Sequence, residues 1–191
     1  ANLEWPDAVV AGPGLVENYW SEQILYKLLY SVTDNETPTL LDAGALRLLA
    51  HETFSKITLH SQTVLTPHPG EAAEMLQITA KEVQKNRIKS AKELQKKYGC
   101  VIVLKGNGTI VCDKNNVYLC SSGGPELAVA GSGDVLSGVI GSLMAQGLPP
   151  IDASITGVGI HAQAGEEFAK DVGKIGLAAG ELIPYIRKFL N

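Results

Sequence analysis

The chain has 191 residues, a length that fits one domain with a sizeable core. Its hydrophobic share of 45% and charged share of 19% exclude an intrinsically disordered polypeptide. The 16 lysine and arginine residues and the 20 aspartate and glutamate residues give a formal net charge of −4, and no basic run is present that would bind a nucleic acid.

Signals for membranes, secretion and disulfides are missing from the sequence. No apolar stretch approaches the roughly 20 residues of a membrane helix, and residues 1–20 lack the features of a signal peptide. Cys100, Cys112 and Cys120 have no zinc-site spacing, so we expect buried structural thiols. These patterns favour a cytoplasmic protein with no membrane and no nucleic-acid partner. The chain opens at Ala1 rather than at a methionine, so we expect an incomplete N-terminus.

Short apolar segments alternate with helical segments along the first half of the chain. Strands are predicted at residues 7–11, 39–42 and 63–66, and helices at residues 21–32, 45–50 and 71–76. Thr79 and Glu82 have the spacing of a capping box. It opens an amphipathic helix that we expect to run without a break to Tyr98.

The second half begins with the strongest predicted strand. Residues 100–105, CVIVLK, are apolar and β-branched, which is typical of a strand covered on both faces. Residues 109–112 and 117–120 then predict a hairpin. Three further helices are expected near residues 134–146, 151–171 and 179–190.

This alternation predicts an α/β fold, in which a mostly parallel sheet lies between two layers of helices. Ligands of such sheets bind at the carboxyl ends of the strands. The loops at residues 12–14, 67–71 and 105–109 each follow a predicted strand, so we expect them to open on the same rim. Asp42 lies on this rim as well. One ligand site is therefore implied.

Gly131, Ser132, Gly133 and Asp134 stand where a glycine-rich stretch turns into an apolar helix. Small residues there let backbone N–H groups converge, and the helix dipole adds partial positive charge, so this turn suits an anion. Asp134 can cap the helix. It can equally take a proton from a hydroxyl that attacks a bound phosphoryl group. Spacing alone leaves these two roles about even.

The loop after the strongest strand has a second pattern of interest, Lys105, Gly106, Asn107, Gly108 and Thr109. An ordinary tight turn accounts for the two glycines, while a lysine beside exposed amides also suits a polyphosphate. The sequence contains no GxxxxGK[ST] motif, which excludes a P-loop enzyme. Leu136 stands where the dinucleotide-binding fingerprint needs its third glycine.

His68 lies between two prolines at the end of a predicted strand. It is either a surface histidine of a turn or, because this loop is rigid, a residue that positions a substrate. Glu71 either favours the start of a helix or holds a water on a magnesium ion. The other histidines, for which we expect structural roles, are His51, His60 and His161.

Four strings, in this order, resemble those of the ADP/ATP-dependent NAD(P)H-hydrate dehydratases of the ribokinase-like superfamily. They are GPG at residues 12–14, TPHPGE at residues 66–71, KGNGT at residues 105–109 and GSGDVLSG at residues 131–138. The HPGE part separates this family from the vitamin and sugar kinases that share the GxGD loop. The resemblance implies a ribokinase-like three-layer α/β/α sandwich with a mostly parallel central sheet, as one domain over residues 1–191. Members usually carry a further N-terminal stretch.

The resemblance implies repair of hydrated NADH or NADPH. With Mg²⁺ present, ADP or ATP would phosphorylate the ring hydroxyl, and phosphate would then be eliminated. Asp134 would be the catalytic base, in an anion hole formed by Gly131, Ser132 and Gly133. The nucleotide would contact Lys105, Gly106, Asn107, Gly108, Thr109 and Gly133, and the hydrate would contact Gly14, His68 and Asp134. A homo-oligomer is also expected.

Three positions depart from the family pattern, and all lie at edges of the implied pocket. Gly124 stands where an asparagine is common, Glu126 replaces a usual glycine, and Gly44 replaces the second aspartate of a common DAD string.

Two rival interpretations remain open. The first is a kinase of the same superfamily that phosphorylates a vitamin-precursor alcohol and releases the product. The second is a nucleotide-binding module without catalytic activity. Recovery of the reduced-nicotinamide absorbance would distinguish elimination from phosphoryl transfer alone.

Overall fold

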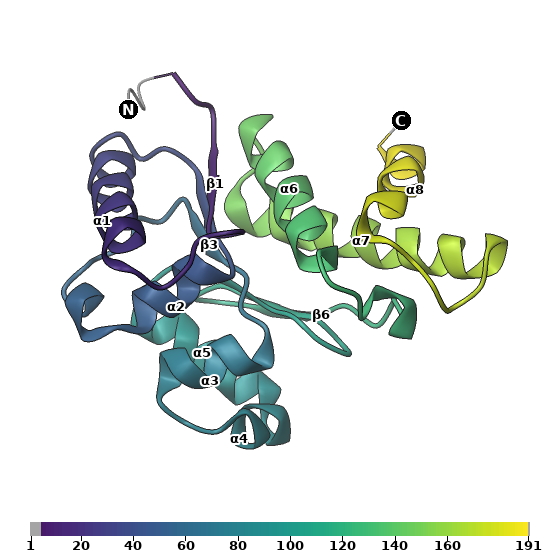
Figure 1. Cartoon of the computed structure of the whole chain (residues 1–191), viewed down its shortest axis with the longest axis horizontal. Helices are drawn as coiled ribbons and strands as arrows, with labels where there is room; N and C mark the ends of the chain where they lie inside the picture. Colours follow the sequence, from purple (N-terminus) through teal and green to yellow (C-terminus); the bar gives the residue numbers. More distant parts are fainter. Residues whose placement is uncertain (1–4, 191) are drawn as a thin grey trace.

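A six-stranded sheet runs through the computed structural model, which describes residues 5–190 (Figure 1). Its strands are β1 (Val9–Ala11), β2 (Thr39–Leu41), β3 (Thr63–Leu65), β4 (Val101–Leu104), β5 (Ile110–Cys112) and β6 (Val117–Leu119), and they lie in chain order. Strands β1 to β4 are parallel, whereas β5 and β6 continue the sheet antiparallel. The predicted mostly parallel sheet and the hairpin across residues 113–116 are both confirmed.

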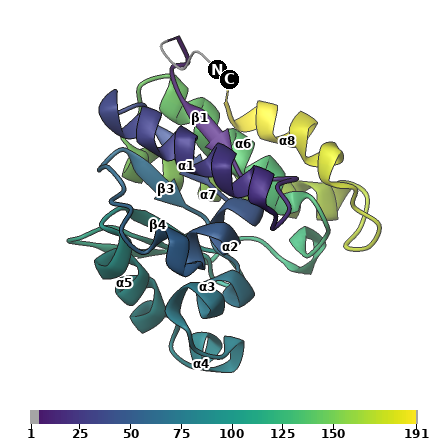
Figure 2. The ribbon, with the colours of Figure 1, turned by 60° about the vertical axis from the view of Figure 1, so that its left-hand side comes forward.

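Helices cover the two faces of this sheet (Figures 1 and 2). The first face carries α1 (Tyr19–Asp34), α2 (Gly44–Ala50), α3 (Pro69–Leu76), α4 (Ala80–Lys85) and α5 (Arg87–Tyr98). The opposite face carries α6 (Ser132–Ala145) and α7 (Pro150–Asp171), and α8 (Leu182–Phe189) packs on α7. Short 3-10 turns lie at Glu52–Phe54, Pro125–Leu127 and Ala179–Glu181. The result is the expected three-layer α/β/α sandwich.

Alternation along each strand places its side chains in two apolar clusters, one on each face of the sheet. Leu41 and Leu65 face the cluster beneath α1 to α5, while their neighbours Leu40 and Val64 face α6 and α7. Successive strand side chains point to opposite faces, so a fully apolar strand serves both layers at once. All four residues of β4 are buried, which confirms that this strand is covered on both sides.

The predicted single helix from Thr79 to Tyr98 is wrong, because it divides into α4 and α5 at Asn86. Asn86 adopts φ −146° and ψ 67°, outside the helical region, and its side chain accepts the N–H of Lys89 at 3.4 Å. Asparagine side chains compete in this way for backbone hydrogen bonds. The Thr79 and Glu82 capping box at the start of α4 is confirmed.

The cysteines are only partly as expected. Cys100 and Cys112 are buried free thiols, and burial raises the pKa of Cys100 to about 12. Cys120 is half-buried and lines a cavity, so the expectation of a buried thiol is wrong there. Among the described residues, no helix combines the length and apolarity needed to cross a bilayer. The expectation of an incomplete N-terminus concerns a segment that would precede Ala1, so the structure does not test it.

Candidate functional site

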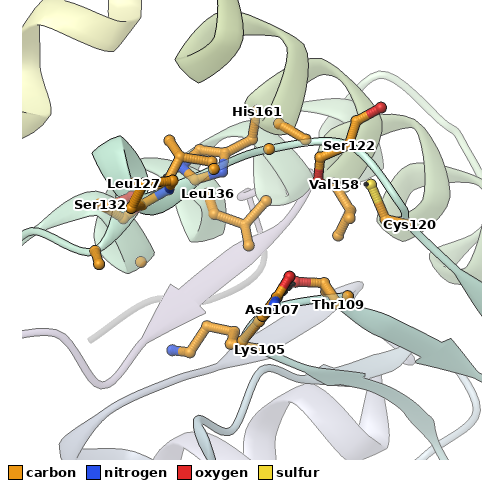
Figure 3. Close-up of a pocket in the computed structure, with 18 residues that line it drawn as sticks. Lys105, Asn107, Thr109, Cys120, Ser122, Leu127, Ser132, Leu136, Val158 and His161 are labelled. Atoms are coloured by element: carbon orange, nitrogen blue, oxygen red, sulfur yellow. Dashed lines mark hydrogen bonds between the residues drawn. The ribbon is translucent and has the colours of Figure 1, made fainter. Parts of the chain in front are cut away.

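The main cavity, of about 500 Å³, lies between the loop after β4 and the helices α6 and α7 (Figure 3). Lys105, Asn107 and Thr109 form one wall, and Ser132 and His161 belong to the opposite wall. The other lining residues are Gly106, Gly108, Cys120, Ser122, Gly123, Gly124, Pro125, Leu127, Ala128, Gly133, Leu136, Val158 and Ala162. The size fits a small-molecule ligand. The structure therefore brings together two of the four strings of the sequence, KGNGT and GSGD.

The first turn of α6 contributes unpaired amides to this region. Gly131 adopts φ +82°, a left-handed conformation that glycine takes without strain. The Ser132 N–H donates to the carbonyl of Val129 at 3.3 Å, so it is already occupied. Within residues 5–190, the N–H groups of Gly133 and Asp134 have no such acceptor. An anion would therefore find these two amides, rather than that of Ser132, at the helix N-terminus.

Lys105 is held at the base of the cavity by Asp42. Its Nζ lies 2.5 Å from Oδ1 of Asp42, whose Oδ2 accepts the hydroxyl of Ser137 at 2.7 Å. The Asp42 side chain is only 1% exposed and that of Lys105 is 18% exposed. A Cβ on Gly133 would lie 3.3 Å from this Nζ, so the ammonium lies in close contact with the first turn of α6. The positive charge of Lys105 and the N-terminus of α6 thus lie side by side, so both can attract the same anion.

A second cavity, of about 370 Å³, lies next to the same rim. Its lining residues are Gly14, Leu15, Val16, Glu17, Ala43, Gly44, Arg47 and Glu71. Oε2 of Glu71 lies 4.0 Å from Nζ of Lys105. Lys105 therefore lines the main cavity and places its amine beside a wall of the second one. The predicted common rim of the three loops is confirmed by these contacts.

Glu71 and His68 form a capping box at the start of α3. Nδ1 of His68 accepts the N–H groups of Gly70 and Glu71 at 2.9 and 3.2 Å, while Oε2 of Glu71 accepts the N–H of His68 at 2.8 Å. An Nδ1 that accepts two amides leaves the ring proton on Nε2, which lies 3.2 Å from Oε1 of Glu71. His68 is thus fully engaged as a helix cap. It is not among the residues that line either cavity.

Asp134 lies in the first turn of α6 with an exposed side chain. Its carboxylate makes no hydrogen bond or ion pair within residues 5–190, so it does not act as a cap there. Of the two roles that spacing left open, the structure therefore does not show capping. Asp134 is not among the residues lining the two cavities.

His161, from the middle of α7, is a site residue that sequence analysis missed. The structure confirms the expected structural role, because its Nε2 lies 3.0 Å from the carbonyl of Ser132 and 3.1 Å from the hydroxyl. It also lines the main cavity. Burial lowers the pKa of His161 to about 4, so the ring is neutral near pH 7 and carries its proton on the nitrogen that faces the carbonyl. No local signal marks it, because His161 lies 29 residues from Ser132 in the chain.

Close backbone packing explains one departure from the family pattern. A Cβ on Gly44 would lie 2.0 Å from the carbonyl oxygen of Leu15, so an aspartate cannot stand there in this conformation. The neighbouring Ala43 adopts φ +47° and ψ −122°, a strained conformation for a residue with a side chain. Strain of this kind clusters at ligand sites. The loop after β2 is therefore shaped by its contact with residues 12–15.

The other two departures are linked to each other. The Glu126 side chain folds back over Gly124, where a Cβ would lie 2.5 Å from one carboxylate oxygen. Glu126 is 3% exposed, whereas Gly124 lines the main cavity. A side chain at position 124 would therefore displace the carboxylate of Glu126 from its present position.

Together, the layers and the rim cavities define a ribokinase-like α/β/α domain with its ligand site at the carboxyl ends of the parallel strands. A ribokinase-like superfamily protein of Enterococcus faecalis superposes with a TM-score of 0.83, at 26% identity over 96% of this chain and 63% of that chain. The sequence profile of the NAD(P)H-hydrate dehydratases matches residues 1–188. The chain belongs to the NAD(P)H-hydrate dehydratase family.

Individual relatives agree with this membership. The chain is 40% identical to the bifunctional NAD(P)H-hydrate repair enzyme Nnr of Vibrio cholerae, over 99% of this chain and 37% of that protein. It is 37% identical to the ADP-dependent (S)-NAD(P)H-hydrate dehydratase of Neisseria meningitidis, over 97% of this chain and 63% of that one.

The ADP/ATP-dependent dehydratase of Bacillus subtilis, co-crystallised with ATP and Mg²⁺, superposes with a TM-score of 0.85. Its identity is 31%, and the match covers 100% of this chain and 66% of that chain. The chain thus spans little more than a third of the Nnr enzyme and about two thirds of the shorter dehydratases.

Proposed function

We propose that the protein dehydrates hydrated NADH or NADPH in a reaction coupled to hydrolysis of ADP or ATP. The observation that carries this proposal is the position of Lys105. It lines the main cavity, and its amine lies against Gly133 and within 4.0 Å of Glu71 in the wall of the second cavity. A reaction between two bound molecules needs such a junction, with positive charge where the transferred group passes.

The nucleotide is assigned to the main cavity. Its mouth combines apolar side chains, such as Leu127 and Val158, with the amide-rich loop at residues 105–109 and the N-terminus of α6. Apolar walls suit the base, and amides with a lysine suit the phosphates. Lys105, Gly106, Asn107, Gly108, Thr109 and Gly133 are the proposed nucleotide-binding residues.

The hydrated dinucleotide is assigned to the second cavity, where Gly14 contributes to the wall. His68 would act from the adjoining cap of α3, where its side chain is 46% exposed. Asp134 is the proposed base that takes the proton of the ring hydroxyl, and amides at the start of α6 would stabilise the phosphoryl charge.

The reaction then has two steps. The hydroxyl oxygen bonds to the terminal phosphorus of the nucleotide, the bond from that phosphorus to the departing AMP or ADP breaks, and Asp134 receives the hydroxyl proton. The ring carbon–oxygen bond next breaks as phosphate leaves, and the neighbouring ring carbon loses a proton, which restores the double bond. Phosphorylation matters because hydroxide is a poor leaving group and phosphate a good one.

Magnesium fits this arrangement as an ion held mainly by the nucleotide. No group of three or more acidic, histidine or cysteine side chains within residues 5–190 forms a metal cage. Mg²⁺ is usually bound through phosphates, waters and one or two carboxylates, and Glu71 could hold one such water. When bound with the nucleotide, the ion would supply positive charge that neutralises the phosphates.

The test combines purified protein with hydrated NADH or NADPH, Mg²⁺, and ADP or ATP. We expect the reduced-nicotinamide absorbance to recover while one phosphate is released for each ring restored. Nucleotide consumption without that recovery would support the kinase, and binding without turnover would support the inactive module; either result contradicts the proposal.

Two further proposals concern the setting of the protein. The three free thiols fit a reducing compartment, which supports a cytoplasmic location. A homo-oligomer is proposed from the family resemblance, and light scattering of the purified protein would test it.

A further inference from the structure

Arg87, the first residue of α5, braces the loop that follows β4. Its guanidinium donates to the backbone carbonyls of Leu104 at 3.1 Å, Lys105 at 3.3 Å and Gly108 at 3.1 Å. A guanidinium presents five donors in a fixed planar fork, so one side chain can hold all three carbonyls. Arg87 thereby ties both ends of the loop to one rigid group.

The direction of these carbonyls decides where the loop amides point. In a trans peptide, the C=O of one residue and the N–H of the next point in opposite directions. Since the carbonyls of Lys105 and Gly108 face Arg87, the N–H groups of Gly106 and Thr109 point away from it. The preceding peptide shows the same relation, because the Lys105 N–H donates to Pro67 at 2.9 Å on the far side from Arg87.

Gly106 and Thr109 both line the main cavity, whereas Arg87 does not. Their N–H groups find no acceptor within residues 5–190. Unpaired amides beside a cavity are donors for an anionic ligand. Gly106 is also shaped for the arginine, because at φ +136° a Cβ would lie 2.8 Å from a guanidinium nitrogen.

The break at Asn86 makes this contact part of the fold. Asn86 ends α4 and caps α5, so Arg87 begins a new helix instead of continuing the old one. Partial burial of the guanidinium lowers the pKa of Arg87, although arginine keeps its charge in proteins.

We propose that Arg87 is a positioning residue of the nucleotide site: by holding the carbonyls of Lys105 and Gly108, it keeps the N–H groups of Gly106 and Thr109 directed at the nucleotide phosphates. Arg87 itself touches no part of the ligand. The inference rests on the proposed function, because that assigns the nucleotide to this cavity, and it specifies how the loop recognises phosphate.

The experiment measures binding of ATP and of adenosine by calorimetry in three variants. Arg87→Met removes the fork, Arg87→Lys keeps the charge without the fork, and Lys89→Met removes one charge from an exposed position two residues further along α5. In Arg87→Met, two backbone N–H groups are no longer oriented to donate to the phosphates, so we expect ATP binding to weaken by about tenfold. Adenosine has no phosphates, so its affinity should change less than about twofold.

Arg87→Lys is expected to recover only a small part of the ATP affinity, and Lys89→Met to bind as the wild type does. In turnover, the Arg87 variants should raise the nucleotide KM more than they lower kcat, which a general loss of folded protein would not do. If Arg87→Met does not fold, Arg87→Lys decides the question by the same comparison.

Four results would overturn the inference. Equal ATP affinity in the wild type and the folded Arg87 variants would remove the positioning role. Wild-type ATP affinity in Arg87→Lys would show that the positive charge alone is enough. An equal loss of affinity for adenosine and ATP would show a general structural role instead. A wild-type protein that does not bind ATP would instead overturn the proposed nucleotide site, and this inference with it.

Discussion

Lys105 and Asp42 are 63 residues apart in the chain, yet Nζ of one lies 2.5 Å from Oδ1 of the other at the meeting point of the two cavities. Asp42 also accepts the N–H of Ala43 at 2.8 Å. The ammonium is therefore held by an almost fully buried carboxylate directly after β2, and it lies beside the start of α6, where we propose that the phosphoryl group is transferred.

Breaking this ion pair should lower the free energy of unfolding more than breaking an exposed ion pair of the same length. Asp42→Asn leaves the Lys105 ammonium without its charged partner in a largely desolvated position, so we expect the free energy of unfolding to fall by about 1–3 kcal/mol, the cost of a group that loses its hydrogen-bond partner. The double variant with Lys105→Met should lose less than the sum of the two single variants. Denaturant titration gives these values.

The Lys170 and Glu167 pair offers a matched control, since its N–O distance is also 2.5 Å but both side chains are exposed. Lys170→Met should show no measurable loss, because water screens an exposed pair. Equal effects at the two pairs would show that burial does not govern the Lys105 interaction.

The proposed base predicts a separation of chemistry from binding. Asp134→Asn should lower kcat by about 10²–10⁴-fold, since general-base assistance is of that size, while the nucleotide dissociation constant stays within about twofold. Asp152→Asn, which changes the exposed first-turn acid of α7, should turn over normally. Normal turnover in Asp134→Asn would refute the assigned role.

His161 predicts a loss of stability in acid. Burial lowers its pKa from 6.5 to about 4, so between these values the unfolded chain binds a proton that the folded protein does not. Stability should therefore fall as the pH drops through this window, by about 3 kcal/mol at its acid end.

His161→Gln keeps a neutral donor for the Ser132 carbonyl but cannot titrate, so its melting temperature should depend less on pH between 7 and 4.5. Burial also lowers the pKa of His60. This residue is present in the wild type and in His161→Gln, so its contribution to the pH dependence of the melting temperature cancels when the two are compared. Identical slopes would show that His161 does not contribute.

The turn at residues 12–14 predicts two very different costs for the same substitution. In Gly12→Ala the new Cβ would lie 1.7 Å from the carbonyl oxygen of Asp42, and the residue would need φ +128°. We expect a loss above about 3 kcal/mol, or no folded protein. Gly14→Ala meets no atom within 4 Å and carries only the strain of φ +78°, about 1–2 kcal/mol. Unfolding curves of the two variants test the difference, and equal losses would contradict it.

Sequence patterns alone determined the layered α/β fold and the rim where its loops meet. Periodicity and glycine placement are local properties, and they located the strands, the KGNGT loop and the start of α6. They could not show that the helix expected after Thr79 ends at Asn86, because an asparagine can either cap a new helix or lie within a continuous one, and the local sequence does not decide between the two.

The tertiary structure alone decided which side chains complete the site. The contact of Asp42 with Lys105 depends on two strands that are separated in the chain. The contact of Arg87 with the loop carbonyls depends on where α5 begins. The contact of His161 with Ser132 depends on how α7 packs against α6. Such contacts carry no spacing signal, because the distance between partners in the chain is set by the length of the intervening elements and not by the chemistry of the pair.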